Sequence, residues 1–287
     1  MKIEFKRALL NPYFVYICLI GILIAIIHSY NNIVLYKSVE SNFYNMVTNG
    51  HNPYYPLFSI FTMWIGQDGE NKIANLFYTI LPIFSVIPYT WSYCKDTETG
   101  YYGKTVKKFG RFNYHLSKYI AVFISSGLVT VVTPIIDFFI SIHFIPATHP
   151  DSVYDIYYEI FSNNFLADIF YTHPVIYVII FILLNFVYYG LFGCIGYAVS
   201  TLLKSKTIAL VTPLIIILII ECISNRINKG TVENCINISP YSFLNPAKSF
   251  YTNWYIIIFE IFFLFITSFV ISVYRFKTNT ELVEENI

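Results

Sequence analysis

The sequence predicts an all-α, polytopic membrane protein with six transmembrane helices and with both termini in the cytoplasm. Of its 287 residues, 56% are apolar and only 12% are charged, which is not the composition of a soluble domain. Apolar stretches of roughly 20 residues, enough to cross about 30 Å of hydrocarbon, recur along the chain. The basic residues also divide unequally between the connections on the two sides of these stretches.

The predicted spans cover residues 13–27, 75–93, 119–145, 175–203, 207–223 and 254–274. A further apolar stretch, 54–66, has the length of an interfacial or re-entrant segment rather than of a span. Before the first span, Phe5, Ala8 and Leu9 lie on one side of segment 1–12. This pattern predicts a short helix on the inner membrane surface, or else an ordinary basic flank that orients the first span.

The lysines and arginines orient the six spans, because short cytoplasmic loops retain positive charge. Five of the 18 basic residues fall on the outer side: Lys37, Lys72, Arg226, Lys229 and Lys248. The other thirteen fall on the cytoplasmic side. The chain is therefore expected to form one domain, 1–287, in the cell membrane, with extracellular loops at 28–74 and 146–174 and a cytoplasmic loop at 94–117. A seventh span would place the most basic loop outside, against the charge rule.

One stretch, ETGYYGKT at 98–105, looks like the end of a phosphate-binding loop. Such a loop needs a glycine five residues before its Gly-Lys, and Glu98 stands there instead. Its carboxylate would repel phosphate, and the stretch lies between two apolar runs rather than between a strand and a helix. We therefore expect no nucleotide site, and no cofactor, on this chain.

The cysteines and histidines show no metal-ligand spacing, so we expect neither a metal site nor a catalytic residue. Cys222 and Cys235 both fall on the predicted outer side and could form a disulfide, which their spacing alone does not decide.

A family resemblance appears between residues 81 and 123. An acidic residue and a glycine follow the second span, then a basic segment, then SKYIA at the start of the third span. In these features the segment resembles the membrane subunit of ABC-2 type exporters, with Glu98, Gly100, Arg111 and Lys118 at the matching positions. FKRALLNPYF, YAVSTLLKSKTIAL and NISPYSFLNPAKSF agree with that family in the same order along the chain.

The resemblance implies an ATP-driven export permease, with ATP and magnesium bound by a separate ABC ATPase subunit. It also implies a homodimer or heterodimer of membrane subunits in the lipid bilayer, and no nucleic-acid partner. The 94–117 loop would form a coupling helix in a groove of the ATPase, with contacts from Asp96, Glu98, Gly100, Tyr101 and Tyr102. The neighbouring lysines would lie near lipid headgroups or the ATPase, or would serve only to set the topology.

Three acidic residues interrupt the predicted spans, namely Asp137, Glu221 and Glu260. A charge at the bilayer centre costs roughly 2.5 to 3.5 kcal/mol, so each needs a partner, water or a proton. They could line an outward vestibule of the export pathway, or they could bond neighbouring helices or reach the surface.

A peptide is one candidate cargo, although composition does not separate peptides from lipids, glycans or drugs. The alternatives are an ion channel, a secondary transporter or an intramembrane enzyme. The sequence shows neither the inverted repeat typical of many transporters nor a known intramembrane catalytic motif.

Overall fold

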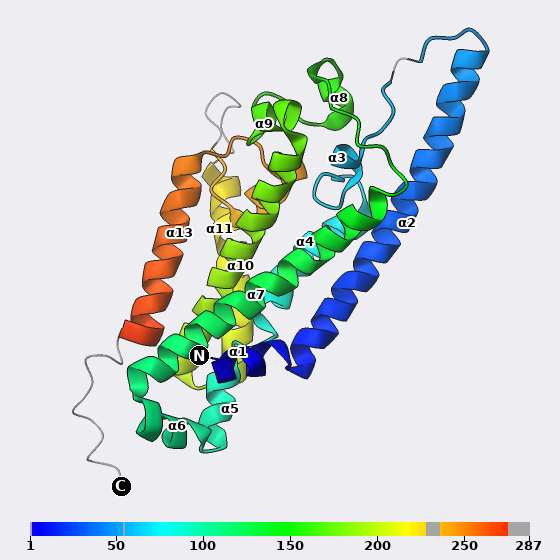
Figure 1. Ribbon diagram of the computed structural model, residues 1–287. Coiled ribbons are helices and arrows are strands. Elements are labelled where there is room, and N and C mark those ends of the chain that lie inside the picture. The colour runs from blue at the N-terminus through cyan, green and yellow to red at the C-terminus, as the bar shows by residue number, and fades with distance from the viewer. Residues whose placement is uncertain (1, 54, 228–235, 275–287) are drawn as a thin grey trace.

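The computed structural model describes all residues except 1, 54, 228–235 and 275–287 (Figure 1). Within this part of the chain, β structure is limited to an isolated bridge between Asn164 and Phe250. Five helices are long and apolar enough to cross a membrane: α2 (Pro12–Thr48), α7 (Arg111–Ser141), α10 (Pro174–Leu203), α11 (Lys206–Ile227) and α13 (Trp254–Phe269) with its π-helical continuation η4 (Val270–Tyr274). The all-α prediction is confirmed, and these helices indicate a multi-pass membrane protein.

Helices α7 and α10 form the centre of the bundle, and small residues let them approach closely. A Cβ atom added to Gly127 would lie 2.7 Å from the carbonyl oxygen of Phe186, and one added to Gly190 would lie 2.9 Å from that of Phe123. Between these glycines the rings of Phe123 and Phe186 meet edge to face, with their centroids 5.6 Å apart. We call this line of contact the glycine seam.

Helix α2 is much longer than the sequence predicts. The first span was expected to end at residue 27 and to lead into an extracellular loop, but the helix continues to Thr48. Its 37 residues rise about 55 Å at 1.5 Å per residue. His28, Asn32 and Tyr36 follow one another at helical spacing and are all buried, so the helix continues with a polar face turned into the protein.

The predicted second span, 75–93, is divided in the structure. Helix α4 (Lys72–Val86) has 15 residues and rises about 22 Å, less than the hydrocarbon thickness of about 30 Å. The helix ends before Pro88, which has no backbone N–H to continue the helical hydrogen bonds. Because the described residues hold five helices of spanning length, the count of six spans and the sidedness of the termini stay predictions.

Short elements gather at the two ends of the bundle (Figure 1). At one end lie α1 (Lys2–Leu9), α5 (Ser92–Glu98) and α6 (Tyr101–Phe109). At the other end lie α3 (Ile60–Met63), α8 (Asp155–Tyr158) after the 3-10 turn η1 (Ser152–Tyr154), and α9 (Ala167–Thr172). Elements α12 (Pro240–Phe243) and η3 (Pro246–Lys248) precede α13.

The possible disulfide cannot be followed in this structure. Cys222 is exposed on α11, whereas Cys235 lies outside the described residues.

Candidate functional site

The predicted coupling loop folds as an elbow of two short helices, α5 and α6, that continues into α7. Gly100 joins α5 to α6 with φ of 70°, a left-handed conformation that glycine adopts without a Cβ penalty. In Figure 1 the elbow lies at the end of the bundle, beside α1. Residues 98–100 at this turn are exposed, so the tip of the elbow is accessible to another protein.

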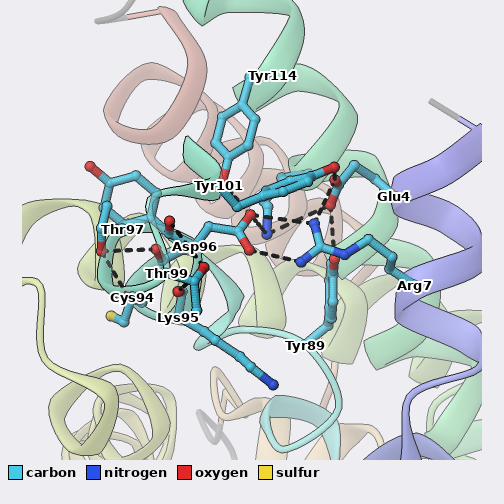
Figure 2. A network of polar contacts seen from close by, with 12 residues as sticks. Glu4, Arg7, Tyr89, Cys94, Lys95, Asp96, Thr97, Thr99, Tyr101 and Tyr114 are labelled. Atoms are coloured by element: carbon cyan, nitrogen blue, oxygen red, sulfur yellow. Dashed lines mark hydrogen bonds and ion pairs between the residues drawn. The ribbon is translucent and has the colours of Figure 1, made fainter. Parts of the chain in front are cut away.

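Asp96, on α5, lies at the centre of a buried polar network (Figure 2). Its carboxylate accepts hydrogen bonds from Arg7 Nη2 at 2.8 Å and from the Tyr114 hydroxyl at 2.6 Å. Lys118 Nζ lies 2.7 Å away, and the Lys118 and Asp96 side chains are 0% and 1% exposed. Burial alone would raise the pKa of Asp96, but Arg7 and Lys118 outweigh it and hold the pKa below its usual range.

Glu4, on α1, completes this network. It accepts a hydrogen bond from Arg7 Nη1 at 2.8 Å and another from the Tyr89 hydroxyl at 2.8 Å, and Lys118 Nζ lies 3.6 Å away. Tyr101, on α6, donates a 3.3 Å hydrogen bond to Glu4, and its ring lies 4.3 Å from the Arg7 guanidinium carbon. We call Glu4, Arg7, Asp96 and Lys118 the clamp network, because these two acids and two bases join α1, α5 and α7.

The structure separates the five predicted ATPase contacts into three groups by their exposure. The carboxylate of Asp96 is buried and bonded inside the chain, so the surface of the elbow does not present it, and contact of Asp96 with an ATPase stays a prediction. Tyr101 and Tyr102 are half-buried, and the Tyr102 ring packs against those of Tyr93 and Tyr114. Of the five, Glu98 and Gly100 are exposed at the surface.

Two surface features flank the elbow. Glu98 forms an exposed ion pair of 2.6 Å with Lys206, the first residue of α11. On the other flank, a cleft of about 330 Å³ lies between α1, α6 and α7, with Tyr101, Phe109 and Asn113 among its lining residues. The predicted basic face of α6 is also at the surface, where Lys104, Lys107 and Lys108 are exposed.

The sequence did not identify Glu4, Arg7, Tyr89 or Tyr114 as site residues. One local signal was present, because Glu4 and Arg7 are oppositely charged and three residues apart on a helix. The pairing of Arg7 with Asp96 joins residues 89 positions apart, which no local pattern shows. The predicted N-terminal helix does form, but its Glu4 and Ala8 are buried against the protein.

The three pathway candidates are not brought together, and no two of them share a hydrogen-bonding partner among the residues that the structure describes. Glu221 accepts hydrogen bonds of 3.0 Å from Asn225 and from Ser242. Glu260 accepts a 3.4 Å hydrogen bond from the Tyr188 hydroxyl. Asp137 is fully buried, so of the two readings considered from the sequence, bonding between helices describes it better than a position on an open vestibule.

Asp137 belongs to a second polar network, at the end of the bundle opposite the elbow. It accepts hydrogen bonds from the Ser29 hydroxyl at 2.8 Å and from the Ile65 backbone N–H at 2.7 Å, and it lies 2.7 Å from His28 Nδ1. The other ring nitrogen of His28 is 3.2 Å from Asp68. Burial would raise the pKa of Asp68, but its hydrogen bonds with His28 and Asn32 lower it.

Metal binding finds no support in the geometry. Among the described residues, no group of three or more histidine, cysteine, aspartate or glutamate side chains is arranged to hold a metal ion.

Comparison with known proteins identifies no family. No family model matches the chain, and no solved structure matches it. The chain is 25% identical over 157 residues to "Uncharacterized protein YybM" of Bacillus subtilis (strain 168), a match that covers 54% of this chain and 61% of that protein. The match thus spans less than two thirds of that relative, whose name assigns no activity.

Proposed function

We propose that this chain is the membrane subunit of an ATP-driven exporter and that its elbow docks on a separate ABC ATPase subunit, which binds ATP and magnesium. In this proposal two membrane subunits, identical or different, form the pathway in the cytoplasmic membrane of a bacterium. Helix α4 is the second of six spans, and both termini lie in the cytoplasm with the elbow. A peptide is the candidate cargo.

The observation that carries the proposal is the attachment of an exposed elbow to the centre of the bundle. The tip presents Glu98 and Gly100, while Asp96, two residues before Glu98, is held by Arg7 and Lys118. Removing one partner of a buried ion pair costs roughly 3 to 5 kcal/mol, so movement of the tip would be passed to α7 rather than absorbed locally. Such a linkage is what a coupling element between an ATPase and a membrane pathway requires.

The test compares two substitutions at the exposed ion pair. Glu98→Arg reverses the charge at the tip, whereas Lys206→Ala breaks the same 2.6 Å pair and leaves Glu98 in place. When the tagged chain is purified from its native membranes, an ATPase with Walker motifs should accompany the wild type and Lys206→Ala. It should be depleted about tenfold or more with Glu98→Arg, because a charge-assisted contact is worth roughly 1.5 to 3 kcal/mol.

Two outcomes would count against docking at Glu98. Equal recovery of the ATPase with both variants would show that the tip is not its contact. Equal loss with both would show that the internal pair with Lys206, rather than a partner, is what Glu98 serves.

A second candidate function is a proton-coupled secondary transporter, which the placement of His28 between Asp68 and Asp137 favours. Ionisable residues inside membrane helices commonly form proton relays. Proteoliposomes that hold the chain alone would then take up protons with a substrate in the absence of ATP, and Asp137→Asn would abolish this uptake. Transport that requires an added ATPase and ATP would instead favour the exporter.

A further inference from the structure

A second cleft, of about 300 Å³, opens beside Asp68 at the end of the bundle opposite the elbow. Three carboxylates line it, those of Asp68, Glu70 and Glu159, and its lining contains no lysine or arginine. We call this cleft the acidic cleft. Its lining also includes the aromatic residues Phe58, Tyr157 and Tyr158.

The three carboxylates come close to one another. The Glu159 carboxylate lies next to the Asp68-Gly69-Glu70 turn, since a Cβ added to Gly69 would be 3.8 Å from Glu159 Oε2. Burial, followed by the charges of Glu70 and Asp68, raises the pKa of Glu159. Asp68 has His28 as an ionic partner, whereas Glu70 and Glu159 have no ion pair within the described part of the chain. The cleft therefore favours a cationic group.

Gln67 supplies an independent indication of a ligand. Gln67 is one of the residues that line the acidic cleft, and it is only 4% exposed. Its Oε1 accepts a 3.2 Å hydrogen bond from the Tyr177 hydroxyl, but its Nε2 has no partner among the described residues. A buried amide N–H₂ without an acceptor is costly, so a ligand that offers a carbonyl oxygen here would relieve that cost.

An ammonium group beside a carbonyl group satisfies both requirements. From the acidic lining and the unpartnered amide, we infer that the acidic cleft binds the free amino terminus of a peptide. The carboxylates hold the α-ammonium, Gln67 Nε2 donates to the first carbonyl oxygen, and Phe58 and Tyr157 receive the first side chain. Three carboxylates exclude a phosphate headgroup, and a volume of about 300 Å³ matches the lower end of the range for small-ligand sites.

The test is isothermal titration calorimetry on the purified full chain in detergent, with no ATPase present. The probes are leucyl-leucinamide, its N-acetyl derivative, leucinamide and butylamine. We expect leucyl-leucinamide to bind and acetylation to weaken binding about tenfold or more, because acetylation removes the charge that the carboxylates hold. Butylamine, which lacks the carbonyl, should bind more weakly than leucinamide. Leucinamide matching the dipeptide would restrict the site to one residue and would overturn the assignment to a peptide.

Two substitutions separate the two halves of the site. Glu159→Gln should weaken leucinamide and butylamine alike, whereas Gln67→Met, of similar volume, should weaken leucinamide and leave butylamine unchanged. Asp155→Asn is the matched control, because Asp155 lies on the same segment as Glu159 but outside the lining of the cleft. Equal binding of the acetylated probe, or unchanged binding by both cleft variants, would overturn the inference. Because no ATPase takes part, that failure would leave the proposed coupling at the elbow intact.

Discussion

The two ends of the bundle hold buried charges in different proportions. In the clamp network, Glu4 and Asp96 meet Arg7 and Lys118, so two acids face two bases. At the other end, within the described part of the chain, His28 is the only base that forms ion pairs with Asp68 and Asp137, and the acidic cleft adds two more carboxylates. A balanced cluster is satisfied within the chain and serves to hold elements together. A cluster with surplus negative charge beside a cleft favours a cationic ligand from outside the chain.

The largest loss of stability is expected from removing one member of the clamp network. Lys118→Met should lower the free energy of unfolding by roughly 3 to 5 kcal/mol, because it leaves Glu4 and Asp96 with Arg7 alone. The melting temperature of the detergent-purified chain measures this loss. The double variant Lys118→Met/Asp96→Asn should recover part of it, because it restores one acid to one base. A single variant that melts with the wild type would show that this cluster does not hold the elbow.

Acidification should change the contributions of the two ends to stability in opposite directions. The pKa of Asp96 is lowered by folding, so its contribution to stability is present at neutral pH and is lost as pH falls through the folded-state pKa. The pKa of Glu159 is raised, so its contribution is present below the ordinary glutamate pKa and is lost as pH rises through the folded-state pKa.

Melting temperatures between neutral pH and about pH 4 test these signs, and the changes should be smaller than the loss in Lys118→Met. Asp96→Asn should flatten the acid-induced loss of stability. Glu159→Gln should melt above the wild type at neutral pH and converge with it in acid. The same pH response in both variants would remove the distinction between the two ends.

The smallest expected effect concerns the ring that covers the clamp network. Tyr101→Ala removes the stacking on Arg7 and the 3.3 Å hydrogen bond to Glu4, and should cost about 1 kcal/mol of stability. Tyr101→Phe keeps the ring and should lose less than half of that amount. Chemical denaturation of the two variants side by side resolves the difference, and equal losses would assign the effect to the hydroxyl alone.

Helices that are apolar on nearly every side were predictable. The prediction of 175–203 coincides with α10 to within one residue, and 254–274 coincides with α13 and its continuation. Helix α2 was not predictable to its full length, because His28 and Asn32 are polar residues that face the protein interior and lower the local hydropathy. The second span is divided next to Pro88. The residues on both sides of this proline are apolar, so hydropathy alone predicts one continuous span.

The candidate sites were predictable only as far as local motifs reach. Glu98 and Gly100 stand in a recognisable order on one loop, and the structure places both at an exposed turn. Asp96 is buried where it pairs with Arg7, a residue 89 positions earlier in the sequence, and no local spacing predicts this pair. The acidic cleft likewise combines Asp68 with Glu159, two residues from separate loops.

The glycine seam limits how this protein can change shape. The carbonyl oxygens of Phe186 and Phe123 lie only 2.7 and 2.9 Å from where β-carbons of Gly127 and Gly190 would be, so the backbones of α7 and α10 are in close contact. If one helix slid along the other, its carbonyl oxygen would clash with a residue larger than glycine on the facing helix. The two helices would therefore tilt together as one rigid body. A change of shape that keeps this contact would therefore move the outer helices relative to α7 and α10, which would stay together.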